Sequence, residues 1–257
     1  MPKLRLDKFL KDQGIASRSE ARELIRKGSV SVNDVIVKNP GTHVNTDEDI
    51  INVKGEQVEY RQFVYYMLNK PKGVITATED KTLKTVLDLF PDEIRRRGVF
   101  PVGRLDKDTE GLLLITNDGI FAHNLLSPKK GVKKLYEALL DSFPGEDAIK
   151  KFEEGVYIGD NYTALPAKLQ YISKDPVRAL VEICEGKFHQ VKRMFKAVGA
   201  SVIELKRLRM GNIRLDETLK PGQFRELTPE ELCQGDGSSD TLFPKNRKNS
   251  TADTPDV

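Results

Sequence analysis

The sequence predicts an α+β protein in two unequal parts, and three observations support this prediction. The chain has 257 residues, enough for one or two domains with a sizeable core. Apolar residues at helical spacing and short apolar strands alternate along most of its length. The pattern changes between Glu59 and Gln62, where a dense apolar strand begins. We therefore expect one domain over residues 1–60 and a second over residues 61–233.

The pattern of residues 1–60 predicts two short helices followed by a small sheet. Gly14 ends the first helix, and Ser17-x-x-Glu20 is a capping box that starts the second, which ends at Gly28. The apolar faces of the helices consist of Leu6, Phe9 and Leu10, then Ala21, Leu24 and Ile25. Strands are expected at 30–32, 35–37 and 50–53, with Asn33-Asp34 as the first turn.

The second part predicts a longer alternation of strands and helices. Its strands are expected at 63–68, 99–102, 112–115, 133–136, 156–158, 167–172, 177–183, 202–210, 213–215 and 224–227. Its helices are expected at 83–90, 121–126, 149–152, 191–198 and 229–232. The first strand ends in the turn Asn69-Lys70-Pro71-Lys72-Gly73, whose lysines could meet phosphates or have no role. Residues 234–257 offer little to bury and predict a disordered tail.

Composition indicates a soluble, well-charged protein, with 32% charged and 38% apolar residues. The longest apolar runs, such as Leu112–Ile115, are far too short for a membrane span, and Met1–Asp7 lacks the apolar core of a signal peptide. We therefore expect a cytoplasmic protein with no membrane partner.

The two cysteines, Cys184 and Cys233, have no metal-ligand spacing, so we predict no metal site. The sequence also lacks a P-loop and a dinucleotide fingerprint, and we expect no cofactor.

The basic residues are unevenly distributed, although the formal net charge is only +3. One group lies in the first thirty residues and comprises Lys3, Arg5, Lys8, Lys11, Arg18, Arg22, Arg26 and Lys27. The other comprises Lys187, Lys192, Arg193, Lys196, Lys206, Arg207, Arg209 and Arg214. Two such groups on a nearly neutral chain predict two phosphate-binding faces. For the group in the first thirty residues, the alternative is an ordinary solvated helix face.

The most informative stretch, residues 101–119, places Asp106 in a tight polar loop. Gly103 and Gly111 bracket this loop and allow backbone angles that other residues resist, and a buried run follows at Leu112–Ile115. A carboxylate held on such a frame is either a solvated turn former or a catalytic group.

The motif Gly103-Arg104-Leu105-Asp106, followed by Thr109-Glu110-Gly111-Leu112-Leu113, resembles the signature of the RNA pseudouridine synthases of the RsuA/RluA superfamily. The resemblance implies that Asp106 is the catalytic carboxylate and leaves Asp108 as an exposed loop residue. It also implies a long, mixed, mostly antiparallel sheet flanked by helices, with a cleft across its middle.

Two further stretches are similar to the same family. Lys134-Leu135-Tyr136 implies that Tyr136 is the active-site aromatic residue; without the resemblance it would be a core tyrosine. His189-Gln190-Val191-Lys192 implies that Lys192 pairs with Asp106, and helical spacing puts Lys192 at the border of the apolar face. Arg193 is the alternative for that role. The lysine form of this motif, with histidine before glutamine, is most similar to RsuA.

The first sixty residues resemble an S4-like RNA-binding domain through Leu6–Leu10, Ile15–Ala21 and Gly28–Asn33. The resemblance implies RNA contacts from Arg5, Lys8, Arg18, Arg22 and Lys27. In the catalytic domain it implies RNA contacts from Arg104, His189, Gln190 and Arg193.

The expected function is isomerisation of a specific uridine in ribosomal RNA, with small-subunit (16S) RNA as the first choice. The expected partner is ribosomal RNA or a subunit assembly intermediate, and we expect the protein to be a monomer. A large-subunit RNA enzyme and a non-catalytic RNA-binding assembly protein are the alternatives. A small-molecule hydrolase is disfavoured because no nucleophile and base are paired in the sequence.

Overall fold

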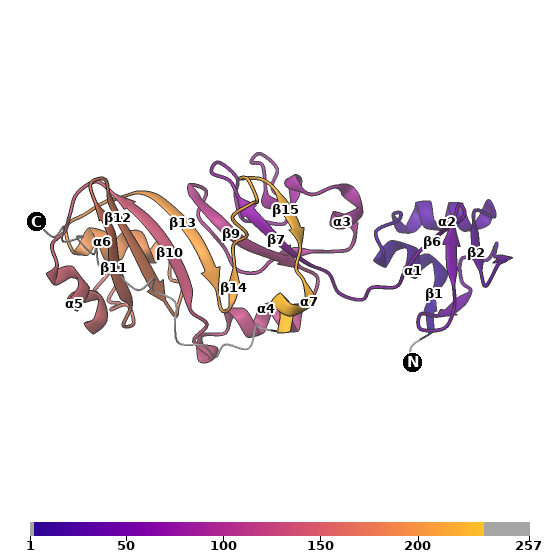
Figure 1. The fold of residues 1–257 in the computed structure, drawn as a ribbon. Coiled ribbons are helices and arrows are strands. Elements are labelled where there is room, and N and C mark those ends of the chain that lie inside the picture. The colour runs from indigo at the N-terminus through magenta and orange to yellow at the C-terminus, as the bar shows by residue number, and fades with distance from the viewer. Residues whose placement is uncertain (1–2, 234–257) are drawn as a thin grey trace, which may run out of the picture.

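The computed structural model describes residues 3–233, which form two parts joined by an extended segment (Figure 1). The predicted disordered tail at 234–257 lies outside the described residues. None of the described helices has the length and apolar character needed to cross a membrane.

The N-terminal part packs two helices, α1 (Leu6–Asp12) and α2 (Arg18–Arg26), against two small sheets. The strands are β1 (Lys3–Arg5) with β4 (His43–Asn45), and β3 (Val35–Ile36), β2 (Val30–Val32), β5 (Ile51–Val53) and β6 (Glu56–Gln57) in that order. The capping box of α2 forms as predicted, with the Ser17 amide donating to the Glu20 carboxylate at 2.8 Å. Gly14 has a φ of +78° and ends α1, also as predicted.

The C-terminal part is built on a nine-stranded sheet with the order β11-β12-β10-β13-β9-β7-β15. Its two short strands, β8 and β14, pair with β9 and β13. The strands are β7 (Tyr65–Lys70), β8 (Phe100–Pro101), β9 (Thr109–Thr116), β10 (Lys134–Leu140), β11 (Lys168–Lys174), β12 (Val177–Ile183), β13 (Val202–Met210), β14 (Ile213–Arg214) and β15 (Phe224–Glu226). Every pairing is antiparallel except that of β13 with β9, which is parallel. The expected mixed, mostly antiparallel sheet is therefore confirmed.

Helices cover both faces of this sheet. They are α3 (Asp92–Arg96), α4 (Gly119–Leu126), α5 (Asp147–Glu154), α6 (Gln190–Ala197) and α7 (Pro229–Cys233), with 3₁₀ turns η1 (Val86–Leu89) and η2 (Pro128–Lys130). On one face, Phe152 of α5 and Phe195 of α6 pack with ring centroids 5.2 Å apart. On the other face, α4 contributes Ala122 and Leu125. Alternate residues of β9 enter the two cores, which explains its continuous apolar run.

Some predicted elements are wrong. The helix expected at 83–90 is only the 3₁₀ turn η1, because the backbone of Lys84 and Val86 is hydrogen-bonded to Ile75 in a bridge and cannot make helical hydrogen bonds. The strand expected at 156–158 is reduced to one isolated bridge between Tyr157 and Thr163.

Two arginines that were assigned to the second basic face are core residues. Arg207 and Arg209 on β13 are each only 3% exposed. Arg207 Nε donates to the carbonyl oxygen of Leu112 at 2.8 Å, and Arg209 is ion-paired with the buried carboxylate of Glu182. The predicted phosphate-binding face therefore loses two of its cations.

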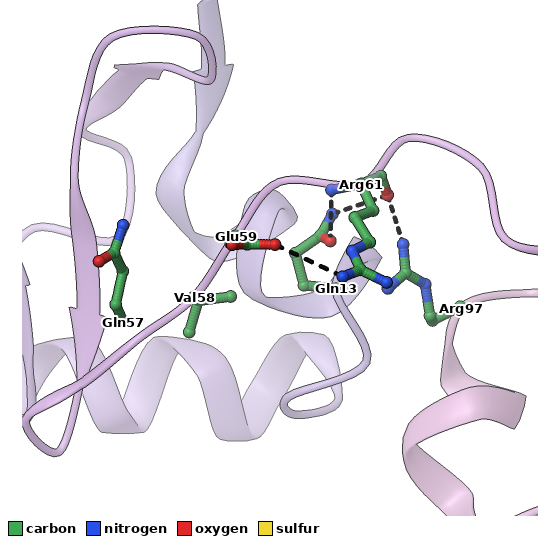
Figure 2. A pocket seen from close by; sticks show the side chains of 6 residues that line it. All are labelled: Gln13, Gln57, Val58, Glu59, Arg61 and Arg97. Carbon is green, nitrogen blue, oxygen red and sulfur yellow. Dashed lines mark hydrogen bonds and ion pairs between the residues drawn. The ribbon is translucent and has the colours of Figure 1, made fainter. Parts of the chain in front are cut away.

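The two parts meet at Arg61, between β6 and β7 (Figure 2). The amide of Arg61 donates to the side chain of Gln13 at 2.9 Å, and its carbonyl oxygen accepts from the guanidinium of Arg97. Beside this junction, the backbone of Gly14 lies so close to the Glu93 carbonyl that no Cβ would fit there. The contacts tie the end of α1 to the segment around α3.

Candidate active site

The Asp106 loop leads from β8 into β9, and the side chain of Lys70 holds its backbone. Lys70 is the last residue of β7 and is fully buried. Its Nζ donates to the carbonyl oxygens of Pro71, Asp106 and Thr109 at 3.1, 3.0 and 2.9 Å. Burial lowers the pKa of Lys70 to about 8, against the opposing effect of the nearby carboxylates.

Sequence reasoning missed this role because it treated Lys70 as a turn residue. The available signal was the two-residue period of a strand, which places Lys70 on the same face as Tyr66 and Leu68. A second support is Thr76, whose hydroxyl donates to the Leu105 carbonyl oxygen at 2.7 Å. The loop is thus fixed through its backbone, which leaves the Asp106 side chain to face the cavity.

Gly111 allows β9 to approach β13 directly below the loop. Its φ is +100°, and a Cβ atom there would collide with the backbone of Arg207. The parallel pairing of Gly111 with Arg207 depends on this absence of a side chain.

Lys192, in the first turn of α6, lies between two carboxylates. Its Nζ is 3.3 Å from Asp106 Oδ2 and 2.6 Å from Asp108 Oδ1. The hydrogen bond from Lys192 lowers the pKa of Asp108. Asp108 is 70% exposed, as expected, but its close contact with Lys192 was not predicted.

Arg193, the alternative for the role of Lys192, makes other contacts. Its Nε donates to the carbonyl oxygen of Ile158 at 2.8 Å, and its guanidinium pairs with Asp160 at 2.6 Å. These contacts tie α6 to the loop after the 156–158 segment.

A small cavity of about 80 Å³ opens beside Asp106. It is also lined by Arg104, Thr109, Tyr136, His189 and Gln190. Tyr136 on β10 is only 8% exposed, and Arg104 is an exposed residue of the loop. The fold therefore brings Asp106, Tyr136 and Lys192 to one place from three different elements.

His189 and Gln190, both expected to contact RNA, differ in their surroundings. The Nε2 atom of His189 is 3.5 Å from Asp106 Oδ1, and its ring stacks on Phe188, which the sequence reasoning did not single out. Gln190 is 3% exposed and uses its amide inside the protein. Its Nε2 donates to Glu185 at 2.8 Å, and its Oε1 accepts from the Lys187 amide at 2.9 Å.

The basic residues of the N-terminal part gather around one buried carboxylate. Asp7 is fully buried, and Arg5 and Arg22 approach it at 3.1 and 3.0 Å, with Arg18 at 3.8 Å. These hydrogen bonds and charges lower the pKa of Asp7 to about 2, although its burial opposes the shift. The three arginine side chains remain 43–60% exposed and form an arginine cluster.

Lys27 does not join the arginine cluster, although the sequence predicted one phosphate-binding face for the basic residues of the first thirty positions. It follows the C-terminal end of α2, whereas Arg18 begins that helix, and it pairs with Glu23 at 2.6 Å. Lys8 is exposed on α1.

No group of three or more His, Cys, Asp or Glu residues is placed to hold a metal ion within residues 3–233. The side chains around Asp106 include cations, an aromatic ring and hydrogen-bonding groups. Such a site can stabilise a carboxylate charge and hold a flat polar ring.

Comparison with known proteins identifies the family of each part of the chain. Residues 64–197 match the RNA pseudouridylate synthase family, and residues 4–51 match the S4 domain. The chain is 49% identical over 231 residues to an uncharacterized RNA pseudouridine synthase, YtzG, of Bacillus subtilis, covering 89% of this chain and 97% of that protein.

Two further relatives carry more specific names. The ribosomal small subunit pseudouridine synthase A of Vibrio cholerae is 42% identical, covering 90% of this chain and 98% of that protein. The ribosomal large subunit pseudouridine synthase B of Bacillus subtilis is also 42% identical, covering 89% of this chain and 93% of that protein. A crystal structure of a pseudouridylate synthase superimposes with a TM-score of 0.64 at 34% identity, covering 90% of this chain and 99% of that one. The chain therefore belongs to the RNA pseudouridylate synthase family and carries an S4 domain at its N-terminal end.

Proposed function

We propose that this protein converts a specific uridine of small-subunit ribosomal RNA into pseudouridine, with Asp106 as the catalytic carboxylate. The observation that carries the proposal is the contact of Lys192 Nζ with Asp106 at 3.3 Å, beside the cavity that Tyr136 lines. A relative named for the small-subunit reaction is 42% identical over nearly its whole length. The motif His189-Gln190-Val191-Lys192 is the feature that favours the small subunit.

The reaction breaks the glycosidic bond between carbon and nitrogen and forms a carbon–carbon bond after the base has rotated. Substrate and product have the same atoms, so the chemistry needs a nucleophile, a holder for the free base and a proton acceptor. The Asp106 carboxylate, with the ammonium of Lys192 3.3 Å away, acts on the ribose or the base. Tyr136 lies against the base and assists removal of the proton from carbon five.

The target uridine must leave its stacked position to reach Asp106. This flipping costs a few kcal/mol, and phosphate contacts elsewhere on the protein offset it. The arginine cluster around Asp7 and the exposed Arg104 are placed to supply such contacts. Binding of RNA should therefore weaken steeply as salt is raised.

The deciding experiment compares the wild type with Asp106→Asn on 16S RNA. The variant should bind RNA almost normally and form no pseudouridine, because the amide cannot carry the charge of the carboxylate. Continued turnover by this variant would remove Asp106 from the mechanism. Normal RNA binding without turnover in the wild type would favour the non-catalytic alternative.

The second candidate is an enzyme for large-subunit RNA, because a relative with that name is equally similar to the chain. Assays with 16S and 23S transcripts, and with purified subunits and their assembly intermediates, separate these substrates. Mapping of pseudouridines in ribosomal RNA from a deletion strain would identify the position. We also propose that the protein works in the cytoplasm as a monomer. Sedimentation at assay concentration tests the oligomeric state, and fractionation of cells tests the location.

A further inference from the structure

Phe188 exposes its apolar ring beside the active site. The side chain is 73% exposed, although it directly precedes His189, which contacts Asp106. Exposure of so large a ring leaves apolar surface in water that most residues of this type bury. A single exposed apolar residue is common on protein surfaces and by itself indicates no function. Phe188 differs because it adjoins His189, which lies beside Asp106.

The backbone that presents Phe188 is fixed by several hydrogen bonds. The Lys187 amide donates to the Gln190 side chain at 2.9 Å, and the Gln190 amide donates to the Lys187 carbonyl oxygen at 3.1 Å. The carbonyl oxygen of His189 accepts from the Arg193 amide at 2.9 Å. His189 itself has a φ of +50°, a left-handed conformation that a non-glycine residue holds only where its surroundings require it.

Phe188 and His189 form a two-ring stack with one open end. Their centroids are 3.9 Å apart and their planes differ by 16°, so His189 covers one face of the phenyl ring. The large exposed fraction of Phe188 leaves its other face open to solvent. The ring spacing is close to the ~3.4 Å step between neighbouring bases of one strand.

We propose that the open face of Phe188 stacks with the base of a nucleotide that flanks the target uridine. The proposal rests on the proposed function, since it assumes that the uridine itself enters the cavity beside Asp106. The exposed Arg104 and Lys107 of the catalytic loop are available for the phosphates of the same strand. Every base has an aromatic face, so this contact positions the strand without selecting a sequence.

The absence of tryptophan from the sequence allows a direct test. Phe188→Trp introduces a single indole at this position, and a base that stacks on it should quench its fluorescence. We would titrate this variant with a 16S RNA transcript in an Asp106→Asn background, so that the signal does not depend on turnover. The matched control is Ile120→Trp on α4, at a position that is 75% exposed.

Quenching of the indole at position 188 but not at position 120 would support the proposal. Equal quenching at both positions, or none at 188, would overturn it. The titration uses the substrate that the wild type modifies, whether the transcript, the subunit or an assembly intermediate, so that missing quenching at position 188 counts against the proposal.

Kinetics provide the second arm. Phe188→Ala should lower kcat/KM by about 5-fold to 150-fold, the range expected for the loss of one stacked base. Phe188→Trp, with Asp106 intact, should restore most of this loss, because it keeps a stacking ring. Because the side chain is exposed, neither change should alter the melting temperature. Full activity of Phe188→Ala would overturn the proposal and leave the proposed function standing.

Discussion

The ammonium group of Lys70 donates a hydrogen bond of 3.0 Å to the backbone carbonyl oxygen of Asp106. A buried cation on one strand thus holds the backbone of the residue that is proposed to do the chemistry. The same group also bonds the carbonyl oxygens of Pro71 and Thr109, on both sides of the loop. Positioning of Asp106 therefore depends on a residue that does not line its cavity.

Lys70→Met should lower the rate of pseudouridine formation by at least about 10-fold, because the carbonyl groups of the loop lose their donor and Asp106 shifts. Methionine fills a similar volume, so the protein should remain folded. The rate can be measured as release of the hydrogen on carbon five of uridine. Lys72→Met, at a neighbouring exposed lysine that pairs with Glu204, is the control and should retain its activity. A wild-type rate for Lys70→Met would show that the loop holds its shape without this ammonium.

Lys192→Ala should reduce kcat by roughly 100-fold or more, since the Asp106 carboxylate loses the charge that lies 3.3 Å away. Lys192→Arg should recover much of this loss because it keeps a cation. Arg193→Ala, whose side chain contacts Ile158 and Asp160, is the matched control, and its kcat should change little. Single-turnover kinetics on bound RNA measure the effect, and a larger loss in Arg193→Ala than in Lys192→Ala would reverse the assignment.

The buried Asp7 should make the N-terminal part sensitive to acid. Its pKa is about 2 in the folded protein, below the ordinary value of 3.8, so its ionised form is stabilised by folding. This contribution, on the order of 2 kcal/mol, is complete above about pH 4 and is lost as the pH falls through 2. Asp7→Asn should therefore be less stable than the wild type at pH 7, and the difference should shrink in acid.

Urea unfolding at several pH values measures that difference. Asp12→Asn is the control, because Asp12 forms only a partly exposed pair with Lys11 at 3.5 Å and should change stability by less than about 1 kcal/mol. A constant difference between Asp7→Asn and the wild type down to pH 2 would contradict the prediction.

Gly111→Ala should destabilise the catalytic part by about 3 kcal/mol or more, because its Cβ would collide with the backbone of Arg207 and force β9 away from β13. Gly119→Ala at the start of α4 is the matched control. Nothing lies within 4 Å of its Cβ position, and alanine favours a helix, so stability should rise slightly or stay the same. Equal stability of the two variants in urea would show that the strands tolerate a wider spacing.

The sequence allowed prediction of features that depend on local spacing. The capping box at Ser17 and Glu20 and the alternating strand 177–183 need only neighbouring residues, and both formed. The contact between Lys192 and Asp106 was predicted only through the resemblance to a family, since no local pattern links residues so far apart. The resemblance also supplied the sheet topology.

Other features were missed because they depend on distant partners. Lys70 and Arg207 are buried cations whose acceptors are carbonyl oxygens of other strands, and composition gives no sign of such acceptors. The register of β13 was also unclear from its charges. The structure gives the reason, since its pairing with β10 is interrupted by two irregularities, at Leu135/Tyr136 and at Leu139/Leu140.

The place of β13 between β10 and β9 determines how much of the chain must be synthesised before the enzyme can work. Within the described sheet, β13 joins the strands that carry Tyr136 to those that follow Asp106. A chain ending at Ala197, where the match to the synthase family ends, would contain Asp106, Tyr136 and Lys192 with the two halves of the sheet unjoined. We therefore expect a nascent polypeptide to stay inactive until Val202–Met210 has left the ribosome.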